Sequence, residues 1–299
     1  MYIDILVGEE IDEKRFVDMY TILAMSSKKE GIEYKDRIVE KVSSYFNEVL
    51  NAVRLNDEER LKQLSKHIHE ARYTRLGYSV SGPGKGFGGD KFSKLIQSIK
   101  KSNAFATGVI NDILDVELYV DNIGVDIISD LITNLIQDIL SEYTEEKLNS
   151  LAMAHLIRKI KTHYWDENGS CWAEKELTML QYKKNIQEEG LYYLLVPQSY
   201  TCDEKQKERI IDNIFENSIH KVCEKIIFNN MYEYGQYVKS TKKGPILYKN
   251  QAARFINEQI GDGLAKEEGN GYITSKGLLD LIEKYPEIKN YIDNMKIPK

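Results

Sequence analysis

The most constraining feature of this 299-residue chain is a long series of apolar residues that starts just after Gly124. The apolar positions recur at helical spacing: Ile127, Ile128, Leu131, Ile132, Leu135, Ile136, Ile139, Leu140 and Tyr143. On an α-helix this spacing gives one wide apolar face, which a stable protein has to bury. We therefore expect a core helix from Gly124 to Tyr143 at the centre of a globular fold.

Much of the remaining chain also shows helical periodicity. It predicts further helices over residues 34–53, 56–75, 90–99, 103–114, 145–163, 204–231 and 275–295. Residues 115–121 alternate between apolar and polar, which fits a short strand, although a helix fits them too. Residues 191–196 are apolar and end at Pro197, which predicts a second strand. The predicted fold class is therefore α+β, mainly α-helical with a few short strands.

The composition shifts after Tyr164, and this shift suggests a domain boundary. We expect a helical N-terminal domain over residues 1–163, which carries the core helix, and a smaller mixed α/β module over residues 164–299. At the start of that module, two tryptophans, Trp165 and Trp172, flank a polar segment. We interpret this segment as a turn between two aromatic anchors.

Composition excludes several classes of protein. With 42% hydrophobic and 29% charged residues, the chain can bury a core, so disorder along its whole length is excluded. A net charge of −6 argues against a general polycation that coats nucleic acid, but leaves room for a local basic groove. The three cysteines have no CxxC spacing, which argues against a zinc knuckle or redox pair. Without a signal peptide or membrane span, we expect a cytoplasmic protein that does not contact the membrane.

A glycine-rich segment is the strongest break in the helical pattern. Gly84, Gly86 and Gly89 satisfy the pattern GxGxxG just before the helix expected from Asp90. Glycine allows close approach of the backbone to an anion, and Lys85 or Lys91 could neutralise a phosphate there. The segment lacks the lysine of a Walker A loop and is not part of a βαβ unit. A phosphate-binding loop and a plain surface loop both fit.

The core helix carries a row of polar residues four positions apart, namely Asp126, Asp130, Asn134 and Asp138. Residues at this spacing lie one above the other on a helix, at the border of the apolar face. Neighbouring carboxylates repel each other, so they need an arginine, a lysine or a divalent metal. We expect Asp126 and Asp130 either to hold Mg²⁺, which could activate water against a phosphodiester, or to form structural ion pairs with Arg72, Arg75 or Arg158.

Arg158 and His163 form the third candidate, because they lie five residues apart near the end of the helix expected over residues 145–163. Helical ribonucleases of the HEPN type resemble this arrangement: their histidine acts as a base and their arginine stabilises phosphate charge. Lys159 departs from that pattern, and a cationic last turn of a helix explains the same residues. His67 and His69 lie two positions apart on a helix, so they make a poor metal pair.

Two segments together resemble a family of uncharacterised bacterial proteins. These are Gly77-Tyr-Ser with the glycine-rich segment after it, and Gly124-Val-Asp-Ile-Ile-Ser-Asp130 at the start of the core helix. The similarity runs from Ile11 to Tyr143, and members of that family are often encoded among phage-defence and restriction genes. The family tends to have an arginine at the position of Ile127, so an arginine-assisted role there does not transfer. The resemblance implies a context, not a reaction.

These observations lead to three hypotheses about function. The first is a bacterial anti-phage defence protein that acts on nucleic acid. In its most specific form it is a metal-dependent nuclease, in which Asp126 and Asp130 bind Mg²⁺ and Lys85 and Lys91 contact phosphates. The second is a non-catalytic subunit whose amphipathic helices dock onto a partner protein or a second copy of the chain. The third is a sensor that binds a nucleotide signal through the glycine-rich segment.

Overall fold

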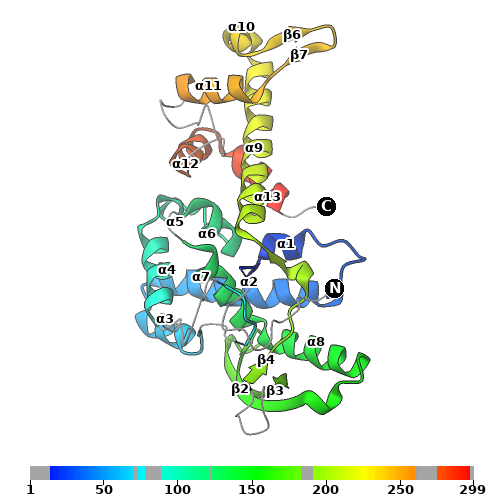
Figure 1. Ribbon diagram of the computed structural model, residues 1–299. Helices are drawn as coiled ribbons and strands as arrows, with labels where there is room; N and C mark the ends of the chain where they lie inside the picture. The colour runs from blue at the N-terminus through cyan, green and yellow to red at the C-terminus, as the bar shows by residue number, and fades with distance from the viewer. Residues whose placement is uncertain are drawn as a thin grey trace. The chain divides into compact units, whose positions relative to one another are not determined.

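The computed structural model describes residues 14–69, 73–77, 89–120, 123–182, 191–259, 261 and 275–296. Within these ranges helices predominate, and the strands are short and pair antiparallel (Figure 1). The predicted α+β class, mainly helical, is therefore confirmed. None of the helices in these ranges combines the length and the apolar character that crossing a membrane requires.

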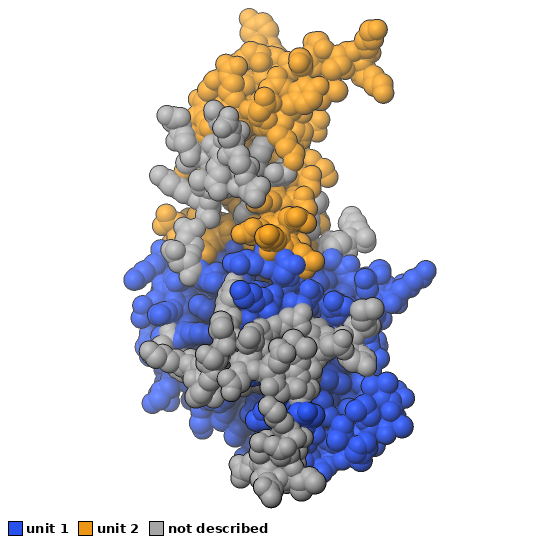
Figure 2. Space-filling view, in the orientation of Figure 1, with its two compact units in different colours: residues 1–101, 110–117, 122–204 blue, residues 102–109, 118–121, 205–299 orange. Residues whose placement is uncertain are grey.

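The chain forms two compact units (Figure 2). Unit 1 comprises residues 1–101, 110–117 and 122–204, and unit 2 comprises residues 102–109, 118–121 and 205–299. The units therefore separate near Glu204, whereas the predicted boundary between residues 163 and 164 falls inside a strand.

Unit 1 contains most of the helices and two small sheets. Its helices and 3₁₀ turns are α1 (Met19–Leu23), η1 (Ile32–Tyr34), α2 (Lys35–Leu55), α3 (Glu58–Ser65), α4 (Gly89–Lys101), most of α6 (Ile113–Tyr119), α7 (Val125–Leu135), α8 (Gln137–Ser150), η2 (Ala154–Leu156) and η3 (Gln198–Tyr200). Its strands are β1 (Phe16–Val17), β2 (Ile157–Asp166), β3 (Cys171–Tyr182), β4 (Leu191–Tyr193) and β5 (Thr201–Cys202). β2, β3 and β4 form one antiparallel sheet, and β1 pairs with β5. Residues 115–121 thus fall mainly in α6, so the helical alternative for them is confirmed.

The core of unit 1 lies between α2 and α7–α8. The apolar face of α2 is buried, as its spacing predicts: Ile38, Val42, Tyr45, Phe46, Val49, Leu50 and Val53. α7 begins after Gly124, as expected, and its apolar side chains from Ile128 to Leu135 are buried as well. Ser129 fixes α7 to β1, because its hydroxyl accepts a hydrogen bond of 2.8 Å from the backbone of Val17.

The predicted core helix is interrupted at Ile136. This residue has φ −99° and ψ 10°, which separates α7 from α8. Two residues earlier, the amide of Asn134 donates a hydrogen bond of 2.7 Å to the carbonyl of Asp130. A side chain that enters the backbone ladder in this way is a known cause of a bend in a helix. Apolar spacing alone cannot reveal such a break, because the same face stays buried on both sides of it.

The helix predicted over residues 145–163 is wrong beyond Ser150. The chain leaves α8 there, Ala152 takes a left-handed conformation with φ 57°, and β2 begins at Ile157. Pairing with β3 decides the outcome, since β2 and β3 are joined residue by residue from Ile157 to Asp166. Trp165 lies opposite Trp172 in this register, so the prediction of a turn between two aromatic anchors is confirmed.

Unit 2 is built around α9 (Glu204–Asn229), the longest helix of the described ranges. Its other elements are α5 (Asn103–Ala106), the end of α6, α10 (Met231–Tyr234), η4 (Gly235–Tyr237), β6 (Lys239–Thr241), β7 (Gly244–Ile246), α11 (Lys249–Gln259), α12 (Ser275–Lys284) and α13 (Glu287–Lys296). Tyr237 and Phe255 pack edge to face at 5.2 Å and anchor η4 against α11. In Figure 1 the β6–β7 hairpin extends beside α10 at one end of α9.

Candidate functional site

Asp126 and Asp130 converge on a lysine. The Nζ atom of Lys91, in the first turn of α4, lies 3.0 Å from Oδ2 of Asp126 and 3.2 Å from Oδ2 of Asp130. Both carboxylates come from α7, where a spacing of four residues places them on one face. The cation that the two acids require is therefore the Lys91 ammonium. Lys91, which we expected to contact phosphate, instead forms ion pairs with these two carboxylates.

Gly77, which belongs to one segment of the family resemblance, lies close to Asp126, which belongs to the other. Gly77 has φ +125°, and a Cβ atom on it would lie 3.0 Å from Oδ1 of Asp126. Only glycine tolerates both this backbone conformation and this close approach. Gly89 begins α4 and so places Lys91 beside the acids, whereas Gly84, Lys85 and Gly86 lie outside the described residues.

The third member of the row, Asn134, ties α7 to the segment after α3. Its Oδ1 atom accepts a hydrogen bond of 3.2 Å from the backbone N–H of His69, and its amide group donates to the carbonyl oxygen of the same residue. Asn134 is buried, and a buried amide is stable only when its polar atoms are paired in this way. Its role is therefore to hold the backbone at His69.

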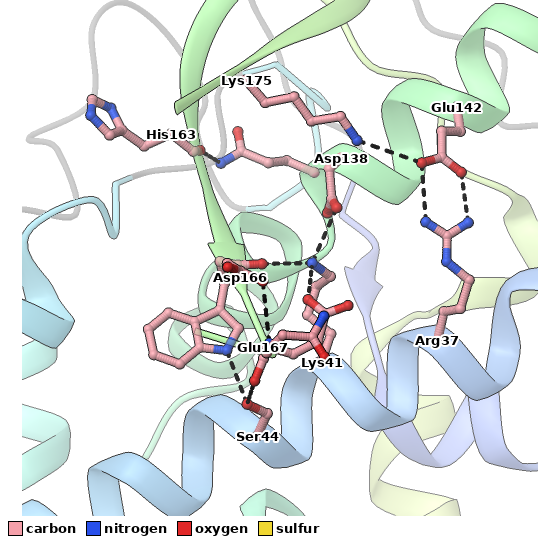
Figure 3. A network of polar contacts seen from close by, with 12 residues as sticks. Arg37, Lys41, Ser44, Asp138, Glu142, His163, Asp166, Glu167 and Lys175 are labelled. Carbon is pink, nitrogen blue, oxygen red and sulfur yellow. Dashed lines mark hydrogen bonds and ion pairs between the residues drawn. The ribbon is translucent and has the colours of Figure 1, made fainter. Parts of the chain in front are cut away.

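The fourth member, Asp138, belongs to a buried charge cluster that sequence reasoning missed (Figure 3). The Nζ atom of Lys41 on α2 lies 3.1 Å from Oδ2 of Asp138 and 2.7 Å from Oε2 of Glu167. It also donates a hydrogen bond of 2.6 Å to the carbonyl oxygen of Trp165. The three hydrogens of the ammonium thus have three acceptors, and the Lys41 side chain is only 2% exposed. The cluster joins α2 and α8 to the β2–β3 turn.

A signal for this cluster exists in the sequence. Lys41 lies three residues after Ile38 and four before Tyr45, inside the apolar stripe of α2. A lysine in a buried stripe requires an acidic partner, because an isolated buried ammonium is too costly. The periodic row on α7 and α8 supplies that partner in Asp138.

The electrostatics of the row follow from these contacts. Burial opposes the charge on Lys91, but the hydrogen bonds and charges of Asp126 and Asp130 together raise its pKa above the ordinary value. Burial raises the pKa of Asp138, although Lys41 acts in the opposite direction. The Oδ1 atom of Asp138 is buried and accepts no hydrogen bond from the described residues. Asp138 is therefore the member of the row that depends most on Lys41, its one ion-pair partner in the described ranges.

Arg158 and His163 do not form the helical pair that we expected. Both lie on β2, where successive side chains alternate between the faces of the sheet, so residues five apart point to opposite sides. Arg158 is exposed, and its guanidinium donates to the carbonyl oxygens of His155 and Ile157. His163 stacks on His67 instead, with ring centroids 3.6 Å apart. The arrangement of a HEPN-type ribonuclease is therefore absent at these two residues.

His67, one member of the stacked pair, is uncharged at neutral pH. Burial, followed by the charges of His163, Lys66 and His69, lowers the pKa of His67 to about 4. The ring of His67 also contacts Trp172 edge to face at 5.7 Å. The pair thus packs as part of an aromatic cluster. In the described ranges, no group of three His, Cys, Asp or Glu side chains is placed to hold a metal ion.

Unit 1 also exposes a run of apolar residues between α8 and η2. Leu151, Ala152, Met153 and Ala154 are consecutive and all exposed, Leu151 at 46%. η2 contacts β3, and the register Tyr182↔Leu191 puts the exposed Leu191 of β4 at the same end of this sheet. Four consecutive exposed apolar residues are uncommon on the surface of a folded protein and mark a candidate interaction surface. We call Leu151–Ala154 the apolar turn.

Comparison with known proteins places the chain in a family. No curated protein and no solved structure matches it. One family model does, described as "Domain of unknown function (DUF8370)", and it covers residues 3–208. This range includes Gly77, Lys91, the polar row of α7 and α8, and the apolar turn. Since the model covers more than half of the 299 residues, the chain belongs to the DUF8370 family.

Proposed function

We propose that this protein is a non-catalytic subunit of a bacterial anti-phage defence complex. The observation that carries the proposal is the apolar turn, where Leu151 and Met153 are exposed beside the sheet of unit 1. An exposed apolar run of this kind is typical of a surface that another protein covers. The defence context rests on the family resemblance, and the cytoplasmic location stays an expectation from the sequence.

The polar row supports a structural role over a catalytic one. Lys91 neutralises Asp126 and Asp130, the backbone of His69 holds Asn134, and Lys41 neutralises Asp138. An Mg²⁺ ion between Asp126 and Asp130 would have to displace the Lys91 ammonium or accept a positive charge beside it. With Lys91 in place the two acids do not also accommodate Mg²⁺, and this favours a structural role for the row.

Co-expression with the products of the flanking genes, one at a time, tests this proposal. We expect one product, or a second copy of the chain, to form a complex that survives size-exclusion chromatography. The double substitution Leu151→Glu/Met153→Glu should abolish the complex, because it places two charges in an apolar interface core. Leu55→Glu is the matched control, since Leu55 is 78% exposed at the end of α2 and should tolerate the charge.

Two results would contradict the subunit proposal. One is a stable complex that Leu151→Glu/Met153→Glu leaves intact while the variant keeps the circular dichroism spectrum of the wild type. The other is nucleic-acid cleavage by the purified chain alone.

The metal-dependent nuclease is a second candidate, and one observation favours it. The Oδ2 atoms of Asp126 and Asp130 already converge on a single cation, so the two acids are preorganised around positive charge. The third hypothesis, a nucleotide sensor, uses Gly84, Lys85 and Gly86, which lie outside the described residues. It stays a prediction from the sequence.

A further inference from the structure

Unit 2 carries a concentration of positive charge that contrasts with the acidic chain. Between Glu233 and Glu258 there is no acidic residue, whereas the chain as a whole has a net charge of −6. The only arginine of this interval, Arg254, is paired with Glu258 at 2.6 Å. The interval also holds four lysines, and all of them are exposed: Lys239, Lys242, Lys243 and Lys249. The interval lies beyond the range that the family model covers.

The lysines at the tip of the β6–β7 hairpin are not required by the turn itself. Thr241 pairs with Gly244, so Lys242 and Lys243 alone form the tip. Tips of two residues normally favour asparagine or glycine. Here Gly244 takes the left-handed conformation with φ +115°, and the Thr241 hydroxyl, which donates to the Gly244 carbonyl at 2.7 Å, closes the turn. Two adjacent lysines repel each other at this position and do not stabilise the hairpin. We therefore attribute a binding role to them.

One face of the same hairpin presents an aromatic ring between the charges. Lys239 and Ile246 are directly paired, which places them on one face of the hairpin, and Tyr248 follows two residues later. The Nζ atom of Lys239 lies over the Tyr248 ring, 5.9 Å from its centroid. Ile246 is 40% exposed and Tyr248 is 46% exposed. The face therefore offers a positioned ring, an aliphatic neighbour and a lysine to the solvent.

We propose that the β6–β7 hairpin and Tyr248 form a binding surface for single-stranded nucleic acid. Phosphates complement Lys239, Lys242 and Lys243, and an unpaired base stacks on the exposed ring of Tyr248. A duplex keeps its bases paired and cannot use the ring. A lipid surface would need more exposed aliphatic side chains than Ile246 alone supplies. This surface belongs to unit 2, whereas the proposed protein interface belongs to unit 1.

The test measures the binding of fluorescein-labelled oligonucleotides to the full chain by anisotropy at several salt concentrations. Single-stranded probes of about 20 nucleotides span more than one stacking site. We expect oligo(dT) or oligo(U) to bind more tightly than a duplex of equal length. Lys242→Ala/Lys243→Ala should weaken binding and lower the slope of log K against log[salt] by about 1.4, which corresponds to two phosphates on a single strand.

Tyr248 needs a separate readout, because its role is stacking. Tyr248→Ala should weaken binding about 5- to 150-fold without changing the salt slope, and Tyr248→Phe should bind like the wild type. Lys221→Ala/Lys225→Ala on α9 is the matched control: it removes the same charge from exposed positions and should bind normally. Three results would overturn the proposal: no binding at low salt, equal loss in both lysine pairs, or preference for phosphatidylserine vesicles or a duplex over the single strand.

Discussion

Replacing Lys41 by Met is expected to lower the free energy of unfolding of unit 1 by about 3–5 kcal/mol. The substitution keeps most of the length of the side chain but removes the only cation that forms an ion pair with Asp138 among the described residues, and the Asp138 carboxylate is 5% exposed. Glu167, at 26%, can turn toward water, whereas Asp138 cannot. Urea unfolding followed by tryptophan fluorescence measures the effect, because both tryptophans of the chain, Trp165 and Trp172, lie in unit 1.

Two further variants separate the buried cluster from ordinary surface charge. Arg37→Met breaks the exposed ion pair with Glu142 and should cost less than about 1 kcal/mol. The double variant Lys41→Met/Asp138→Leu should recover most of the lost stability, since apolar residues often replace a buried ion pair at no cost. If Lys41→Met were no more destabilising than Arg37→Met, the buried cluster would not stabilise the fold as we describe.

Trp165→Ala is expected to lower the free energy of unfolding by about 3–5 kcal/mol. Trp165 is fully buried and packs edge to face on Tyr45 at 4.9 Å and on Trp172 at 5.7 Å. Removing it opens a cavity where the β2–β3 turn meets α2, and it also breaks the hydrogen bond to Ser44. The fluorescence of Trp172 still reports on unfolding of the variant.

The control for this prediction is an exposed aromatic residue. Tyr232 is fully exposed on α10, so Tyr232→Ala should change stability by less than about 0.5 kcal/mol. If the free energy of unfolding of Trp165→Ala were within about 1 kcal/mol of the wild-type value, the β2–β3 hairpin would pack only loosely on α2. That result would contradict the buried position of Trp165.

The sequence allowed the helical core to be predicted, because burial follows directly from apolar spacing. The face of α2 and the start of α7 after Gly124 lie where that spacing puts them. β2 was missed, because Ile157 and Ile160 also fit a helix and only pairing with β3 decides between the two. The Asn168-Gly169 dipeptide between the tryptophans is the local signal that favours a hairpin.

The polar row shows both the reach and the limit of sequence reasoning about a site. A spacing of four residues correctly placed Asp126 and Asp130 on one face and required a cation for them. It could not identify that cation, since Lys91 is 35 residues from Asp126 in sequence and reaches it only through the packing of α4 on α7. The prediction of a pair formed by Arg158 and His163 was wrong for a simpler reason. A spacing of five residues brings two side chains together only on a helix, and both residues lie on β2.

Mg²⁺ binding at Asp126 and Asp130 tests the central claim most directly. Calorimetric titration of the wild type and of Asp126→Asn/Asp130→Asn with Mg²⁺, combined with a cleavage assay on DNA and RNA, measures it. If Lys91 neutralises the two acids in a structural cluster, the two proteins will show the same Mg²⁺ titration and neither will cleave. Mg²⁺ binding and cleavage by the wild type that both disappear in a folded double variant would contradict the account and establish the nuclease.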